Sequence, residues 1–202
     1  MIANLGLGAL FITFLVSIYS AIAAVYGAKR NDQTWIESAR RATLLTFPLL
    51  TISALSIIIL LVKGSYEVEY VASVTSNSMP AYLRITALWG GQAGSLVFWS
   101  WLMSAFISAV TLRQWKRDRE FLPWVILVAM VTLAFFLILT LFVENPFERI
   151  WIAPTGMIET SLFQPAGMTL FTPQDGQGLN PLLRHYGMVI HPPLLYLGFV
   201  SF

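Results

Sequence analysis

The sequence has 202 residues and a formal net charge of +2; 57% of its residues are hydrophobic and only 11% are charged. Because soluble domains carry about 25% charged residues, this balance predicts a membrane protein, and the small basic excess argues against nucleic-acid binding. The chain contains no cysteine, which excludes disulfides and thiolate metal sites formed by its own residues.

Four apolar stretches are long enough to cross a bilayer, whose hydrocarbon core of about 30 Å needs about 20 helical residues. The first stretch starts at once and continues too far for a cleaved signal peptide, so we interpret it as a retained span. None of the four contains Asp, Glu, Lys, Arg or His, which argues against an ion or proton pathway through them. The predicted spans are residues 4–28, 42–62, 88–112 and 123–143.

A fifth apolar run, over residues 192–202, has about half the length that a crossing helix needs. The sequence therefore predicts an all-α integral membrane protein, folded as a single membrane domain over residues 1–202, with four complete transmembrane helices and the start of a fifth. We expect the chain to be the N-terminal part of a longer multi-helix protein or one piece of a split protein.

Positively charged residues cluster in two of the connections, over residues 29–41 and 113–120. Short loops rich in Lys and Arg lie on the cytoplasmic side of a membrane. We therefore expect the N-terminus and the two other connections, residues 63–87 and 144–190, to lie outside. The clustered residues are Lys29, Arg30, Arg40, Arg41, Arg113, Lys116, Arg117 and Arg119.

The first external connection enters the third span through the sequence WGGQAGS, which allows two interpretations. In the first, Trp89 is an interfacial anchor, and Gly90 and Gly94 form a small-residue face for a neighbouring helix. In the second, the glycine backbone, including Gly91, forms one wall of a site for a large flat ligand together with the indoles of Trp89, Trp99 and Trp101. Physical principles alone favour the packing interpretation, because both of its features are common in membrane helices.

The second external connection is long and rich in proline and glycine, as functional or disordered loops often are. Asp175 and Asn180, in the sequence QDGQGLNPLL, are best interpreted as turn and capping residues. The stretch TPQDGQG lacks the strand-and-helix context of a nucleotide-binding turn, so no phosphate site is predicted.

The last twelve residues read HPPLLYLGFVSF, with a histidine before two prolines. Proline suits the first turn of a helix and disfavours a helical conformation at the residue before it, so the pattern predicts His191 as the N-cap of a helix that starts with Pro192 and Pro193. There the helix dipole favours the neutral imidazole, which is the form that binds a metal. His191 is thus either a cap or a ligand. His185 is poorly placed to complete a zinc site with it, whereas a haem iron needs as few as one protein ligand.

Several motifs together resemble the N-terminal part of the CcmF family of cytochrome c biogenesis proteins. They occur in the same order as in that family and extend from about residue 70 to the end of the chain. The motifs are YVAS, LWGGQAGSLVFW, NPFER, DGQGLNPLL and HPPLLYLGFVSF.

The resemblance implies a multi-pass protein of the bacterial inner membrane, with its N-terminus outside, that takes part in the covalent attachment of haem to apocytochrome c on the periplasmic side. It implies haem b as substrate or cofactor, and His191 as one axial ligand of the haem iron. The implied partners are the haem chaperone CcmE, the proteins CcmH and CcmI, and apocytochrome c. Other motif residues have no assigned chemistry and are either haem-pocket or packing residues: Trp89, Gly90, Gly91, Gly94, Pro192 and Pro193.

The chain departs from the family pattern in two respects. It lacks the tryptophan-rich WWD segment, the second external histidine and the histidines of the family's internal haem, so we expect these 202 residues alone to be inactive. It also has extra residues over 150–171, which we interpret as a lid or a docking surface. Two alternatives to a lyase portion stay open: a haem-handling membrane subunit, and a scaffold piece of a split lyase without catalysis of its own.

Overall fold

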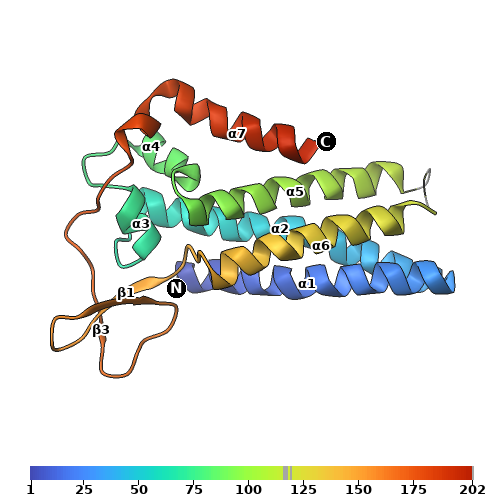
Figure 1. Cartoon of the computed structure of the whole chain (residues 1–202), viewed down its shortest axis with the longest axis horizontal. Helices are drawn as coiled ribbons and strands as arrows, with labels where there is room; N and C mark the ends of the chain where they lie inside the picture. The colour runs from blue at the N-terminus through green and yellow to red at the C-terminus, as the bar shows by residue number, and fades with distance from the viewer. Residues whose placement is uncertain (116–117, 119, 202) are drawn as a thin grey trace.

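The computed structural model describes residues 1–115, 118 and 120–201, and four long helices lie side by side in it (Figure 1). Each is long and apolar enough to cross a membrane, which confirms the predicted helical membrane fold. The chain is therefore a multi-pass membrane protein. The four helices are α1 (Ile2–Arg30), α2 (Gln33–Lys63), α5 (Gln92–Gln114) and α6 (Leu122–Phe142).

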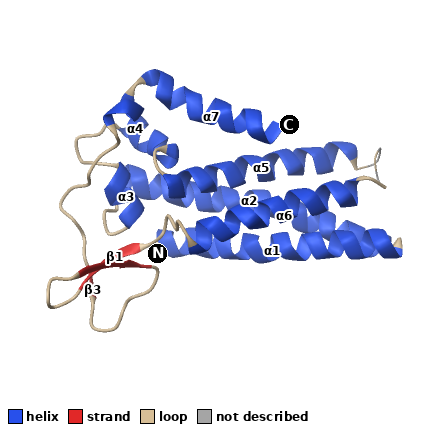
Figure 2. Cartoon of the chain, viewed as in Figure 1, coloured by secondary structure: helices blue, strands red, loops and turns tan. Residues whose placement is uncertain are grey.

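The remaining elements begin at one end of the bundle, where the N-terminus also lies (Figure 2). Short helices follow α2, a small sheet follows α6, and α7 returns alongside α5. These elements are α3 (Glu69–Val74), α4 (Ala81–Thr86), the 3-10 turn η1 (Ala87–Trp89), β1 (Arg149–Ile152), β2 (Ile158–Ser161), β3 (Thr169–Leu170), the 3-10 turn η2 (Pro181–Arg184) and α7 (Tyr186–Ser201).

Small and polar side chains hold α1 and α2 together. The Ser20 hydroxyl donates to the Ala39 carbonyl at 2.9 Å and lies 2.8 Å from the Thr43 hydroxyl oxygen. Ala24 and Ala39 are completely buried nearby. In a membrane, where lipid tails are as apolar as leucine, close backbone approach and hydrogen bonds of this kind drive helix association.

The turn between α1 and α2 is tighter than the connection expected over residues 29–41. Only Asn31 and Asp32 separate the two helices: Asn31 has a left-handed conformation with φ 51°, and the Asp32 carboxylate caps α2 by accepting a backbone N–H. A side chain at Gly27 would collide with Ile36, so glycine permits this close return. A longer connection was expected because residues 33–41 are mostly polar, but they form the first turns of α2.

The predicted basic clusters therefore lie partly in helix. Lys29 and Arg30 form the last turn of α1, whereas Arg40 and Arg41 lie within α2, where both pair with Glu37. These residues lie at the end of the bundle away from the sheet, and the cytoplasmic location of that end stays a prediction. Arg113 lies in the last turn of α5, and the residues outside the described part of the chain are Lys116, Arg117 and Arg119.

A three-stranded antiparallel sheet, in the order β2–β1–β3, forms within the segment over 149–170. Trp151 at its centre pairs with Glu159 on one side and Leu170 on the other, and its indole N–H donates to the Ser161 carbonyl at 3.0 Å. The sequence interpretation contained no strand here. The sheet is a small addition to a mostly helical fold, and pairing between separate short segments is not visible in an apolar pattern.

Arg84 ties the end of α2 to the turn before α4. Its guanidinium donates to four backbone carbonyls, at 3.0 Å to Val62 and at 3.1 Å to Ser76, Asn77 and Met79. A planar fork with five N–H donors suits such a set of carbonyls, and a lysine ammonium cannot reproduce it.

We expect Arg84→Lys to lower stability by about 1.5–3 kcal/mol, because hydrogen bonds from a charged donor are lost while the charge itself is kept. Thermal unfolding of the detergent-solubilised chain, followed by circular dichroism, measures the change. Arg113→Lys, an exposed arginine at the other end of the bundle, is the matched control. Equal midpoints for the two variants would contradict a structural role for Arg84.

Candidate functional site

The candidate site is a half-open pocket of about 320 Å³ at the end of the bundle where α5 begins. The chain reaches it through η1 and then passes Gly90 and the extended Gly91, which precedes the first residue of α5. The lining comes from this turn, from the first two turns of α5 and from α7: Trp89, Gly90, Gly91, Gln92, Ser95, Leu96, Trp99 and Tyr196.

Aromatic rings form the wall of the pocket and join three helices. Trp99 of α5 stacks on Tyr196 of α7 with ring centroids 5.4 Å apart, and lies 4.6 Å from the ring of Phe136 on α6. Phe98 contacts both Tyr196, at 5.9 Å, and Trp89, at 5.3 Å. Offset and edge-on aromatic pairs add about 0.5–1.5 kcal/mol each beyond the area that they bury, so these contacts position α7 on the bundle.

The floor of the pocket depends on Tyr70 of α3. Its hydroxyl donates to the carbonyls of Ala87 and Leu88, at 2.8 and 3.1 Å, and so holds η1 in place. Burial raises the pKa of this phenol, which keeps it protonated as a donor. A side chain at Gly94 would collide with the Tyr70 hydroxyl, and one at Gly91 would press on the same ring. These two glycines therefore make room for a tyrosine, not for a neighbouring transmembrane helix.

The DGQG turn closes the site from outside. Gln177 and Gly178 donate backbone N–H groups to the carbonyls of Ala72 and Thr75, at 2.7 and 3.1 Å, and Leu179 then fills the space that a side chain at Gly90 would occupy. The connection over residues 144–190 is thus packed onto the connection over residues 63–87. This contact explains Gly90 as a packing residue that also lines the pocket.

Asp175 and Asn180 have the turn and capping roles predicted for them. The Asp175 carboxylate accepts the backbone N–H groups of Asn77 and Gly176, both at 2.7 Å, and Asn180 accepts that of Leu182 at 3.0 Å. The hydrogen bond from the Asn77 amide, followed by that from Gly176, holds the pKa of the Asp175 carboxyl below its ordinary value.

Three carboxylates lie beside the pocket, around a separate cavity of about 180 Å³ that also includes Gly91 and Gln92. Burial raises the pKa of Glu69, and repulsion from Glu148 and Glu144 raises it further. The pKa of Glu148 is raised for the same two reasons, burial first and Glu144 second. Among the described residues, no group of three His, Asp or Glu side chains has the arrangement of a metal site.

The predicted capping role of His191 is wrong, because α7 begins earlier, at Tyr186. His185 is the cap: its Nδ1 accepts the Gly187 N–H at 3.2 Å, and its carbonyl accepts the Met188 N–H at 2.9 Å. No role was predicted for His185. The two prolines lie inside the helix, which continues through them because the preference of pre-proline residues for extended conformations is a bias that packing can override.

His191 lies on the outer face of α7. Tyr196, which faces α5, follows it by five positions, or about 140° around the helix. The structure brings Trp89, Gly90 and Gly91 together in the pocket and places Gly94 beneath them; the predicted residues that it leaves outside the pocket are His191, Pro192 and Pro193. His191 itself is exposed.

A family profile described as "Cytochrome C assembly protein" matches residues 89–202, more than half of the chain. The chain belongs to the cytochrome c assembly protein family. All eight residues that line the pocket fall within the part of the chain that matches this family, whereas Tyr70 lies before it.

Individual relatives show the same relationship over the whole chain. The sequence is 32% identical to the cytochrome c-type biogenesis protein CcmF of Haemophilus influenzae and 30% identical to that of Escherichia coli, and the chain spans 28% of the length of each. A protein called NrfE in Haemophilus influenzae is 27% identical, with 29% of its length covered. A solved structure, "Cytochrome c Heme Lyase CcmF", has the same fold with a TM-score of 0.77 at 19% identity, over 100% of this chain and 28% of that one.

Sequence reasoning missed three residues on which the site of this family member depends: Tyr70, Leu179 and Tyr196. Each belongs to one of the motifs that carried the resemblance, namely YVAS, DGQGLNPLL and HPPLLY. Their place in these motifs could have marked them as candidate site residues. Their contacts could not be predicted, because they join segments that are far apart in the chain. Through these three residues the motifs contact other segments of the chain.

We expect Gly94→Ala to destabilise the chain by about 1–3 kcal/mol, because an added methyl group must displace the buried Tyr70 ring from its carbonyl partners. Thermal unfolding in detergent measures this. Gly198→Ala is the matched control, since a side chain there would meet no other atom within 4 Å. A Gly94→Ala protein as stable as wild type would contradict this prediction, because the Tyr70 ring would then move without loss of stability.

We expect the contribution of Asp175 to stability to be lost in acid. Because its pKa is lower in the folded chain, this contribution is complete above the ordinary carboxyl pKa of about 4 and disappears as the pH falls through the lower folded value. The difference in unfolding midpoint between wild type and Asp175→Ala should therefore shrink between about pH 5 and pH 2. A difference that is constant across this range would assign the effect to packing alone.

Proposed function

We propose that this chain is the N-terminal part of a haem lyase that matures c-type cytochromes, and that it holds haem as a substrate on the periplasmic side of a bacterial inner membrane. The observation that carries the proposal is the exposed imidazole of His191 on the outer face of a helix whose opposite face is packed on the aromatic wall. Relatives with the names CcmF and NrfE, and a solved structure of a protein named as a haem lyase, support it.

The outer face of α7 is chemically suited to a macrocycle. Leu194 and Leu195 are 60% and 44% exposed beside His191, and the space next to Gly198 is open. Haem binding needs an axial ligand together with apolar contact area, and this face offers both. His191 would hold the iron while the leucine side chains lie against the edge of the porphyrin.

The pocket lined by Trp89 and Tyr196 has a different part in this proposal. Its volume of about 320 Å³ is at the lower end of the range of about 300–1,000 Å³ for small-molecule sites. The pocket would therefore accept a substituent of the haem ring and not the whole macrocycle. The stacking of Trp99 on Tyr196 instead sets the rotation of α7, and with it the direction of His191. The aromatic wall is therefore a positioning element.

The bond-forming chemistry would come from the substrates. In thioether formation, each thiol of the Cys-x-x-Cys-His motif in apocytochrome c adds across a haem vinyl group: the sulfur bonds to one carbon and the proton goes to the other. This chain has no cysteine of its own, so its contribution would be binding and orientation. Haem b would be delivered by a chaperone such as CcmE, and apocytochrome c by CcmH and CcmI.

We expect His191→Ala to reduce covalent haem attachment at least tenfold in the complete protein that contains this chain, because the iron loses its ligand here. The measurement is haem-stained cytochrome c in a bacterium without its own lyase, with membrane insertion checked by immunoblot. His185→Asn is the matched control, since asparagine retains the cap of α7. Attachment at the wild-type level with His191→Ala would refute the ligand assignment.

A second candidate is haem presentation without lyase activity, because the exposed face of α7 with His191, Leu194 and Leu195 offers only an axial ligand and apolar contact area. The two functions differ in one readout. If the complete protein carries haem, detected by its Soret absorbance, but forms no thioether product with apocytochrome c in a reconstituted system, presentation is its function. Product formation that depends on His191 supports the lyase.

A further inference from the structure

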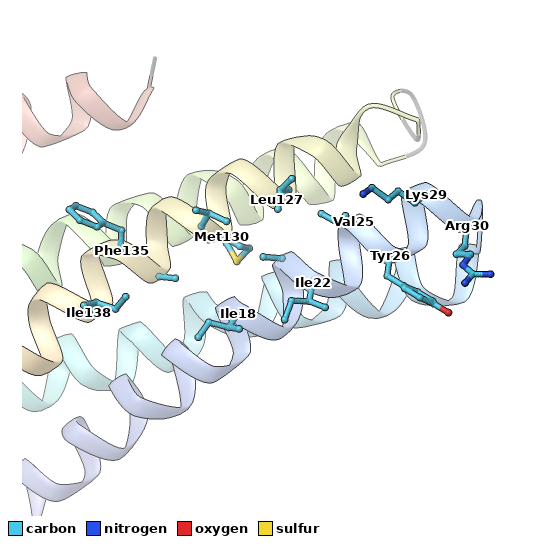
Figure 3. A pocket seen from close by; sticks show the side chains of 13 residues that line it. Ile18, Ile22, Val25, Tyr26, Lys29, Arg30, Leu127, Met130, Phe135 and Ile138 are labelled. Atoms are coloured by element: carbon cyan, nitrogen blue, oxygen red, sulfur yellow. The ribbon is translucent and has the colours of Figure 1, made fainter.

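An apolar groove of about 850 Å³ runs between α1 and α6, away from the candidate site (Figure 3). Its walls are aliphatic and aromatic side chains of the two helices, including Ile22 on α1 and Val131 and Phe135 on α6. These three side chains are 64%, 55% and 55% exposed. Because both helices are long and apolar enough to cross a membrane, this surface lies at the depth of the hydrocarbon core.

One end of the groove is cationic. Lys29 and Arg30, in the last turn of α1, line that end, as Figure 3 shows. The ion pairs within the described part of the chain involve Glu37 and leave both of these residues out. The nearby Asp32 carboxylate is engaged in capping α2. The two positive charges are therefore available to an anion that enters the groove from this end.

Aromatic side chains mark the depth of the membrane surface at the same place. Tyr26 and Trp35 meet edge to face, with ring centroids 5.1 Å apart, and are 44% and 40% exposed. Such amphipathic rings gather at the level of lipid headgroups. Lys29 and Arg30 lie one turn farther along the helix, and the Arg30 guanidinium lies 5.6 Å from the Tyr26 ring centre. The cations are thus at phosphate depth, while the walls of the groove are at acyl-chain depth.

We propose that the groove between α1 and α6 binds an anionic phospholipid, with one acyl chain along the apolar walls and its phosphate at Lys29 and Arg30. Charge complementarity favours a lipid over a second copy of this chain. Two copies related by an axis along the membrane normal would bring the same two cations together at the same depth, and like charges repel. This proposal does not depend on the proposed haem function.

Native mass spectrometry of the purified chain in detergent, mixed with equal amounts of dioleoyl phosphatidylglycerol and dioleoyl phosphatidylcholine, tests the preference. Wild type should retain the anionic lipid preferentially. The double variant Lys29→Gln/Arg30→Gln should bind it about 10- to 30-fold more weakly, since each basic residue near a membrane surface strengthens the binding of anionic lipid about fivefold. Arg41→Gln/Arg113→Gln removes two exposed cations at the same end of the bundle but outside the groove, and should bind as wild type does.

The position of the bound lipid is tested with a phosphatidylglycerol that carries a photoreactive group on its acyl chain. Cross-links should map to residues 18–26 of α1 and residues 127–138 of α6. Equal retention of the two lipids by wild type, the same loss in both double variants, or cross-links confined to other helices would each overturn the proposal.

A second copy as occupant gives a distinct result. Because the chain has no cysteine, Val131→Cys introduces a single thiol at the groove wall. Rapid disulfide-linked dimer formation in phosphatidylglycerol vesicles would show protein and not lipid at this position, and would overturn the proposal. A thiol that stays monomeric under oxidation, in a protein that retains phosphatidylglycerol, supports it.

Discussion

The hydroxyl of Tyr70 occupies space that exists only because Gly91 and Gly94 lack side chains, and from there it donates to the carbonyls of the turn that precedes α5. This one contact sets the direction in which the chain enters the third span. It also leaves Gly90 facing Leu179, so that the DGQG turn of the second external connection can close over the first. The end of the bundle that carries the sheet is therefore one packed unit, although its parts come from three separate regions of the sequence.

The position of α7 follows from the same arrangement. Since η1 and the start of α5 are held by Tyr70, Trp99 is fixed where Tyr196 can stack on it, and this stacking turns the opposite face of α7 outward. His191 and the leucines beside it are exposed because they lie on the face of α7 that points away from α5. In a protein of the cytochrome c assembly family, an exposed imidazole on a helix held by aromatic contacts is the basis for the proposed haem ligand.

The two ends of the bundle differ in chemistry. The end that carries the sheet has a network of backbone hydrogen bonds closed by Arg84 and Asp175, with carboxylates beside it whose pKa values are raised by burial. The opposite end has a tight turn capped by Asp32 and a basic surface that leads into an apolar groove.

The sequence by itself determined the membrane class, the four spans and the motifs that identify the family, because hydrophobic length and local motifs are properties of contiguous residues. Only the tertiary structure decided which residues meet. In the structure His185 caps α7, and not His191 as predicted, and Tyr70 lies beneath Gly94. Three strands pair in the segment where only a lid or docking surface was expected. The physical reason is the same in each case: long-range packing determines these positions, and neither periodicity nor the local preference of a residue before proline contains that information.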